Sequence, residues 1–473
     1  MGRRDRRHSG RRRKRALGLW VPVVLVLAIL GGAAAAYHYD LGARWFGTTT
    51  PGPAVAPSIP GLTLPTPTTP RPVARPAPAA TADRHAVRRA LAKPLANPAL
   101  DDLRAVVAPL QGSPLLEIGH GLSMPASSMK LLTTTAALSV LGPDHTFATR
   151  VAAHGRHRIT LVGGGDPFLA GKRPPAGTYP PRASLQDLAG LTARRLRSTG
   201  DRQVRLDYDT SLFSGPGVNP HWPAGYISGN VVSPITSLWA DEGLTPDGLS
   251  RVADPAATAA ADFASYLRAD GIHVTGTPRD HPAGAQDREV ARVTSAPLGD
   301  LVERILQTSD NEGAEVLAHQ VGLAVTGRGS FTAGVAGVTK ILGGLGIDLH
   351  GARVFDGSGL SRDDRVDVRT LVQLLQYDAA PGHTDQRAVV TGLPVAAFNG
   401  SLSGRFDGTS GAGWVRAKTG TLTGTSALVG LAQDARGRLL VFAFVSNHVP
   451  YVGTLATRAA LDALASALAA CRC

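Results

Sequence analysis

The chain has 473 residues, of which 43% are hydrophobic and 18% charged, so it is long enough to bury a large core and too apolar to be disordered throughout. Its formal net charge is +13, but nine of the Lys and Arg residues lie within Met1–Arg15. Because no aromatic-interleaved basic motif and no zinc-finger spacing appears, the charge does not indicate nucleic-acid binding. We expect more than one domain and no nucleic-acid partner.

The N-terminal segments predict export from the cytoplasm. Residues 1–15 form a basic segment, and residues 16–36 form an apolar run without charged side chains that spans roughly 30 Å of hydrocarbon as a helix. The basic segment is expected to stay in the cytoplasm. A cleaved signal peptide is the competing interpretation, because Ala33–Ala36 offers small residues for cleavage. We favour a transmembrane anchor, since the apolar run is longer than a usual signal core, and otherwise expect a secreted protein.

Two further features lie at opposite ends of the chain. Residues 37–82 are rich in Pro and Thr and predict an extended linker. The only cysteines, Cys471 and Cys473, exclude a disulfide framework and a Cys-based metal site. Because cysteines separated by one residue bond only with strain, a frayed C-terminal tail is expected. The 14 histidines form no metal-binding motif, and we expect no metal or cofactor.

The strongest local signal is Ser127-Ser128-Met129-Lys130, which opens a helical pattern that ends at Gly142-Pro143. Residues i and i+3 share a helix face, so the Lys130 amine can accept the proton of the Ser127 hydroxyl. The chain has six lysines against 43 arginines, and Lys130 is the only lysine with Ser three positions before it. Arg does not lose its proton in proteins, whereas a desolvated Lys can. The pattern therefore indicates a serine nucleophile with a lysine base, with a surface lysine as the alternative.

A second element, Ser309-Asp310-Asn311, lies between the helical patterns of residues 298–306 and 312–323. At such a break, Ser309 and Asn311 can both point into a cleft, where they would relay a proton and bind a peptide group. The alternative is a capping turn, because Ser, Asp and Asn all favour helix starts.

A third element, Lys418-Thr419-Gly420-Thr421, lies in the first of two apolar segments that predict paired strands, the second being 439–445. On a strand, Lys418 and Gly420 share one face, and the edge is suited to holding a carboxylate. Gly420 would allow the substrate backbone to approach closely. An exposed Lys-Thr pair on an edge strand is the alternative.

Taken in order, these three elements resemble the motif set of penicillin-binding proteins and serine β-lactamases. Ser127 and Ser309 are 182 residues apart, which leaves room for an inserted domain. That arrangement resembles the class C low-molecular-mass penicillin-binding proteins, the D-alanyl-D-alanine carboxypeptidases and endopeptidases of peptidase family S13. Other stretches are similar to this family, among them 161–167 and 356–362, which we assign to turns because the chemistry requires none of their side chains.

For the reaction, the resemblance implies that Ser127 is the acylated nucleophile and Lys130 its general base. Ser309 is expected to help pass the proton to the leaving D-alanine. Lys418, as a nearby cation, is expected to lower the pKa of Lys130.

For the substrate, the resemblance implies that Asn311 binds the peptide group and that Lys418 and Thr419 bind the terminal carboxylate. The backbone N–H groups of Ser127 and Thr421 are expected to form the oxyanion hole. The implied partners are the peptidoglycan stem peptide and β-lactam antibiotics.

The expected fold class is α+β, with an antiparallel sheet and flanking helices as in penicillin-binding proteins. Strands are expected at 103–110, 114–119, around Lys418 and from 439, with a final helix near 454–469. We expect a peptidase domain from residues 83–145 and 293–473, and a mainly β insert with a few helices at 146–292.

The sequence favours a D-Ala-D-Ala carboxypeptidase, with D,D-endopeptidase activity left open. Two alternatives remain: a serine β-lactamase, which shares the acylation step, and a non-catalytic penicillin-binding sensor. The insert favours the peptidase over a compact β-lactamase, and the completeness of all three motifs argues against loss of catalysis.

Overall fold

The structure is a computed structural model that describes residues 82–473, which lie within one compact unit. The predicted basic segment, the apolar run at 16–36 and nearly all of the linker lie outside the described residues. Among the helices of residues 82–473, none combines the length and the apolar character that a membrane span requires.

The first of two five-stranded sheets is antiparallel throughout and contains the strands expected from the sequence. Its strand order is β10-β11-β12-β1-β2. The strands are β1 (Leu103–Pro109), β2 (Leu116–Ile118), β10 (Val415–Leu422), β11 (Gly424–Gln433) and β12 (Leu439–Val449). Strands β11 and β12 are buried almost continuously rather than on alternate residues, because helices cover both faces of the sheet.

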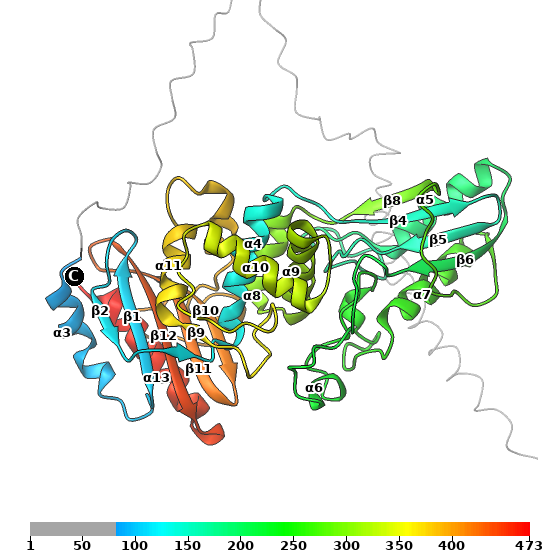
Figure 1. Cartoon of the computed structure of the whole chain (residues 1–473). Helices are drawn as coiled ribbons and strands as arrows, with labels where there is room; N and C mark the ends of the chain where they lie inside the picture. Colours follow the sequence, from blue (N-terminus) through cyan, green and yellow to red (C-terminus); the bar gives the residue numbers. More distant parts are fainter. Residues whose placement is uncertain (1–81) are drawn as a thin grey trace, which may run out of the picture. The chain divides into compact units, whose positions relative to one another are not determined.

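Helices pack on both sides of this sheet and enclose two hydrophobic cores (Figure 1). On one face lie α3 (Arg84–Leu95) and α13 (Thr454–Ala470). On the other face, α11 (Val368–Asp378) packs against β1, β11 and β12. The same core includes α4 (Met129–Leu141), α8 (Leu298–Thr308), α9 (Asn311–Thr326) and α10 (Phe331–Gly344). The helix expected after Ser127 is α4, and the predicted final helix is α13.

The segment 146–292, called the insert below, contains most of a second five-stranded sheet with its own core. Its strands are β4 (Ala148–His154), β5 (Arg158–Val162), β6 (Gln203–Asp209), β7 (His273–Thr275) and β8 (Arg288–Thr294), in the order β7-β6-β5-β4-β8. Two helices, α5 (Leu185–Ser198) and α7 (Pro255–Ala269), connect the parallel strands β5, β6 and β7, as crossover connections require. Helix thus contributes to the insert alongside the expected strands.

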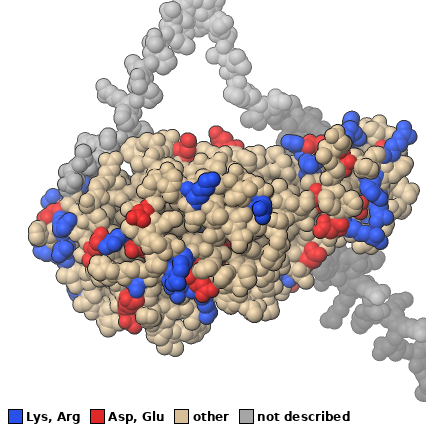
Figure 2. Space-filling view, in the orientation of Figure 1, with Lys and Arg blue, Asp and Glu red and all other residues tan. Residues whose placement is uncertain are grey.

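The remaining elements are short connections. They are β3 (Leu122–Ser123), which pairs with β9 (Val366–Asp367), α6 (Gly225–Ser228), α12 (Arg387–Thr391), and the 3-10 turns η1 (Ala126–Ser128), η2 (Asp241–Gly243), η3 (Thr384–Gln386), η4 (Gly400–Leu402) and η5 (Tyr451–Gly453). On the face that Figure 2 shows, Lys and Arg are interspersed with Asp and Glu. These charged residues are densest over β4, β5 and β6.

The C-terminal end differs from the sequence-based prediction. We expected a frayed tail, but Cys471 and Cys473 are buried and joined by a disulfide. The backbone N–H of Asp83 donates to the Cys473 carbonyl at 2.7 Å, and that of Ala435 to the Cys471 carbonyl at 2.9 Å. The prediction of a frayed tail was wrong because both cysteines belong to the apolar core that α3 and α13 form against the sheet.

Candidate active site

Ser127 lies in the 3-10 turn η1, directly before α4, and Lys130 lies in the first turn of that helix. This places the Lys130 side chain beneath Ser127, and its Nζ atom donates to Ser127 Oγ at 3.1 Å. Lys130 is completely buried, whereas Ser127 is partly exposed. The spacing of three residues therefore brings the hydroxyl and the amine into contact, as the sequence predicted.

Burial lowers the pKa of Lys130 from its ordinary value of 10.5 to about 8. Four carboxyl groups oppose this effect and raise the pKa: Asp356, Glu315, Asp310 and Glu312, in decreasing order of influence. A lysine with a pKa near 8 has an appreciable neutral fraction close to neutral pH, which a general base needs.

We expected Lys418 to lower the pKa of Lys130, but burial is the leading cause. The pKa of Lys418 itself is well below 10.5, first because the side chain is buried and second because Lys130 repels its charge. Lys130 thus lowers the pKa of Lys418, whereas Lys418 is not among the groups that shift the pKa of Lys130.

The Ser309-Asp310-Asn311 segment joins α8 to α9. It is a helix-capping turn, and it also directs side chains to the buried lysines. Ser309 ends α8 with a left-handed backbone (φ 60°), and Asp310 caps α9 by accepting the Gly313 N–H at 2.8 Å. At the same time, Ser309 Oγ accepts a hydrogen bond from Lys418 Nζ at 2.8 Å. Asn311 Oδ1 accepts one from Lys130 Nζ, also at 2.8 Å. The capping turn therefore directs both flanking side chains to the two buried lysines.

Strand β10 places Lys418 against Ser309, and the Lys418 amine also donates to the Thr419 carbonyl at 2.8 Å. Thr419 Oγ1 donates to Ser401 Oγ at 2.9 Å, and Thr421 is exposed. A Cβ atom on Gly420 would lie 2.7 Å from the Pro125 carbonyl oxygen. Gly420 thus allows β10 to approach the turn that carries Ser127, and the expected close approach of substrate at Gly420 stays a prediction.

One part of the site was missed in the sequence. We assigned 356–362 to a turn, yet the Ser358 carbonyl accepts a hydrogen bond from Lys130 Nζ at 2.8 Å. Gly359 has φ +81°, and a Cβ there would lie 1.9 Å from the Ala126 carbonyl oxygen, so only glycine fits against the turn before Ser127. The similarity of this stretch to the family was the available signal, but a backbone carbonyl leaves no mark in the side-chain pattern.

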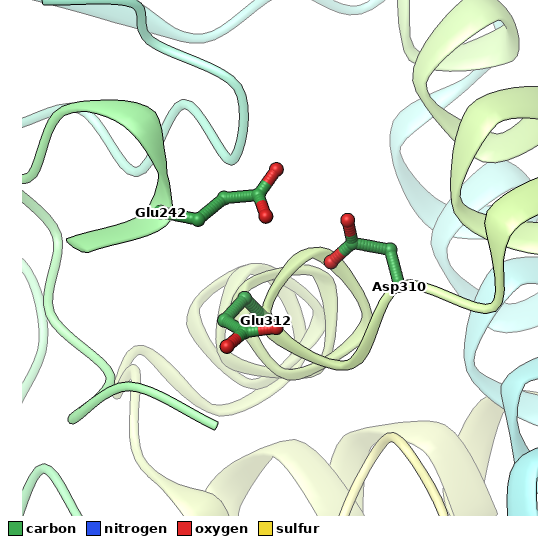
Figure 3. Close-up of side chains that lie close together, drawn as sticks. All are labelled: Glu242, Asp310 and Glu312. Atoms are coloured by element: carbon green, nitrogen blue, oxygen red, sulfur yellow. The ribbon is translucent and has the colours of Figure 1, made fainter. Parts of the chain in front are cut away.

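Three carboxyl groups lie close together, as Figure 3 shows. Glu242 from η2, Asp310 and Glu312 each place a carboxylate oxygen within 4.8 Å of the others. Arg251 is already paired with Glu312 at 2.8 Å, and burial together with Asp310 raises the pKa of Glu312 to about 7. Glu242 and Asp310 also border a cavity of about 780 Å³ between the insert and α8. The cluster already contains one cationic partner in Arg251.

The family comparison identifies this arrangement. Residues 87–250 and 244–470 match the D-Ala-D-Ala carboxypeptidase 3 (S13) family. The chain belongs to this family. The match covers the three motifs and the insert, so the expected family and the expected enzyme class, a D-Ala-D-Ala carboxypeptidase, are confirmed.

Curated relatives agree with this assignment. Carboxypeptidase DacB of Mycolicibacterium smegmatis is 36% identical over 97% of each chain. A D-alanyl-D-alanine carboxypeptidase of Actinomadura is 32% identical over 73% of this chain and 77% of that protein.

Among solved structures, penicillin binding protein 4 of Haemophilus influenzae matches with a TM-score of 0.66. It is 22% identical, and the match covers 80% of this chain and 97% of that chain. This likeness confirms the expected α+β fold of a penicillin-binding protein.

Proposed function

We propose that the carboxypeptidase reaction proceeds through an acyl-enzyme on Ser127. The observation that carries this proposal is the position of Lys130 Nζ, 3.1 Å from Ser127 Oγ and 2.8 Å from Asn311 Oδ1. A buried lysine with a pKa near 8 in contact with a serine hydroxyl supports the role of general base.

In the proposed acylation, the neutral Lys130 amine takes the Ser127 proton as Oγ attacks the carbonyl carbon of the D-Ala-D-Ala peptide bond. The backbone N–H groups of Ser127 and Thr421 stabilise the oxyanion. The C–N bond then breaks, and the leaving D-alanine nitrogen receives a proton through Ser309. Water hydrolyses the ester on Ser127 and releases the shortened peptide.

For substrate binding, Lys418 and Thr419 hold the terminal carboxylate of the peptidoglycan stem peptide, and Asn311 binds its peptide group. The buried position of the Lys418 amine, 2.8 Å from Ser309 Oγ, supports this role because a fixed cation in a dry site binds a carboxylate strongly. A requirement for a terminal carboxylate favours carboxypeptidase over endopeptidase action. A β-lactam would acylate Ser127 by the same attack, which opens its ring.

The proposed location is outside the cytoplasm, where D-Ala-D-Ala peptides of the cell wall are found. The apolar run at 16–36 is proposed to anchor the chain in the membrane, with a secreted form as the alternative. The division into a peptidase domain (83–145 and 293–473) and an inserted domain (146–292) also stays a proposal. The separate core of the second sheet supports it.

Labelling with a fluorescent penicillin, followed by peptide mapping, tests the proposed nucleophile. We expect an adduct on Ser127, none in Ser127→Ala, and release of D-alanine from a diacyl peptide ending in D-Ala-D-Ala. The exposed Ser198→Ala at the end of α5 is the matched control. Rapid turnover of a chromogenic cephalosporin without D-alanine release would favour a β-lactamase, and folded protein without an adduct would favour a sensor.

A further inference from the structure

The Lys130 amine has three hydrogen-bonding neighbours, and their number matters for its proposed role. Besides Ser127 Oγ, it contacts Asn311 Oδ1 and the Ser358 carbonyl oxygen, each at 2.8 Å. A neutral amine has two N–H bonds and one lone pair. When both N–H bonds go to the two carbonyl oxygens, the lone pair is left facing Ser127 Oγ, as proton abstraction requires.

The Ser358 carbonyl is fixed by a buried carboxylate. The N–H of Gly359 belongs to the same peptide group as the Ser358 carbonyl, and it donates to Asp356 Oδ1 at 2.6 Å. The other oxygen of Asp356 accepts the Ser361 N–H at 2.6 Å and the Trp222 indole N–H at 2.8 Å. Asp356 is 1% exposed, so these N–H donors take the place of water in orienting its carboxylate.

Trp222 comes from the insert, 134 residues before Asp356 in the chain. Its ring packs edge-on against Phe331 of α10, with the ring centroids 5.3 Å apart, and it shares a buried cluster with Leu360. Nearby, Asn219 Nδ2 donates to the Phe355 carbonyl at 2.8 Å. The insert therefore forms hydrogen bonds with the 356–362 loop at Asp356 and with the residue just before it.

We propose that the insert positions the general base through Trp222 and Asp356. Trp222 fixes the Asp356 carboxylate, Asp356 fixes the peptide group of Ser358, and the Ser358 carbonyl directs the Lys130 lone pair to Ser127. Trp222 and Asp356 are positioning residues, since they act through Lys130. The inference rests on the proposed role of Lys130 and gives the insert a part in the acylation step.

Glu315 of α9 supports the same loop from another side. Its carboxylate accepts the N–H groups of Gly357, at 3.0 and 3.1 Å, and of Ser358, at 2.8 Å. The charged groups that act on Lys130 are thus Asp356 and three acidic residues of α9 and its N-cap, namely Asp310, Glu312 and Glu315. Lys130 in turn lowers the pKa of Lys418 on β10.

The first test compares Trp222→Phe with Trp239→Phe. Both side chains are buried in the insert segment, and each indole N–H makes one buried hydrogen bond, but that of Trp239 goes to the Asp166 carbonyl at 3.1 Å, within the insert. Stopped-flow kinetics with a fluorescent penicillin separates non-covalent binding from acylation. We expect Trp222→Phe to acylate about tenfold more slowly with unchanged binding, because a hydrogen bond to a charged group is lost. Trp239→Phe should acylate at the wild-type rate.

Two outcomes of that comparison would overturn the inference: wild-type acylation by Trp222→Phe, or equal loss in both variants, which would indicate general loosening of the insert. If the wild type itself forms no Ser127 adduct, the proposed function fails instead, and the two failures remain distinguishable.

The second test uses Asp356→Asn and the pH dependence of acylation. In either orientation, the amide nitrogen of Asn would face an N–H donor that the carboxylate now accepts, so the loop should lose its fixed position. Asp356 is also the carboxylate that most strongly raises the pKa of Lys130. We expect slower acylation at all pH values together with a shift of the pH profile to lower pH. Acylation at the wild-type rate on the plateau of the profile would contradict the inference.

Discussion

Lys130 and Lys418 are both completely buried, but the regions that hold them differ in charge. Four carboxyl groups raise the pKa of Lys130, which lies on α4, and so limit the effect of burial. They belong to α9, to the N-cap of α9 and to the 356–362 loop. Lys418, on β10, contacts Ser309 Oγ and the Thr419 carbonyl, and no ion pair joins it to a carboxylate among residues 82–473. A buried cation without a fixed counter-charge is suited to receive one from the substrate. The carboxylates near Lys130 keep its pKa in a useful range for a base.

The largest expected effect tests Lys130 as the base. Lys130→Arg keeps a cation in the same place but cannot accept a proton. Because general base catalysis typically contributes 10²–10⁴-fold, we expect acylation by a fluorescent penicillin to fall about a thousandfold. Lys93→Arg, at an exposed position of α3, is the matched control and should react at the wild-type rate. An active Lys130→Arg protein would refute the assignment.

Lys418→Gln tests whether the second lysine recognises the carboxylate. A charge-assisted hydrogen bond contributes about 1.5–3 kcal/mol, so kcat/KM for a peptide ending in D-Ala-D-Ala should fall roughly tenfold to a hundredfold. The C-terminal amide of the same peptide lacks the charge, and its hydrolysis should change much less. Equal losses for acid and amide would assign Lys418 to proton transfer rather than to binding.

The pH profile of the wild type compares the two lysines in one measurement. Lys130 acts as a base only when neutral, so acylation should rise about tenfold per pH unit below its pKa of about 8 and then level off. Lys418 binds a carboxylate only when charged, and its pKa lies well below 10.5. Binding of a free-carboxylate peptide should therefore weaken at high pH, whereas binding of the amide should not. An identical alkaline limb for both peptides would contradict this division of roles.

Much of this arrangement could be predicted from the sequence, because it depends on local spacing. The contact between Ser127 and Lys130 follows from three residues on one helical turn, and Ser309 and Asn311 follow from a break between two helical patterns. The strand of Lys418 follows from its apolar segment, but the predicted pairing with 439–445 was wrong, because β11 lies between β10 and β12. These features depend only on short stretches of chain. The order of the three motifs then indicates the resemblance to penicillin-binding proteins.

The remainder could not be predicted, because it depends on contacts between distant residues and on backbone groups. The Ser358 carbonyl is a backbone atom, and Asp356 meets Trp222 across 134 residues. The buried C-terminal disulfide depends on the core between α3 and α13, which the local sequence of Cys471 and Cys473 does not reveal. The effect of Glu315 on Lys130 likewise required the position of α9 relative to α4.

The smallest expected effect concerns the carboxylates that distinguish the two lysines. Glu315 raises the pKa of Lys130 more strongly than Glu312 does, and both lie on α9. Burial lowers the pKa of Lys130, and the charges of Glu315 and Glu312 raise it. If either charge is removed, the pKa of Lys130 should fall and the acylation profile should move to lower pH. We expect a larger shift for Glu315→Gln than for Glu312→Gln, whose carboxylate is already paired with Arg251. The rates are compared over the full pH range, because Glu315→Gln also alters the support of the Ser358 loop. A larger shift for Glu312→Gln would contradict the stronger influence of Glu315 on the pKa of Lys130.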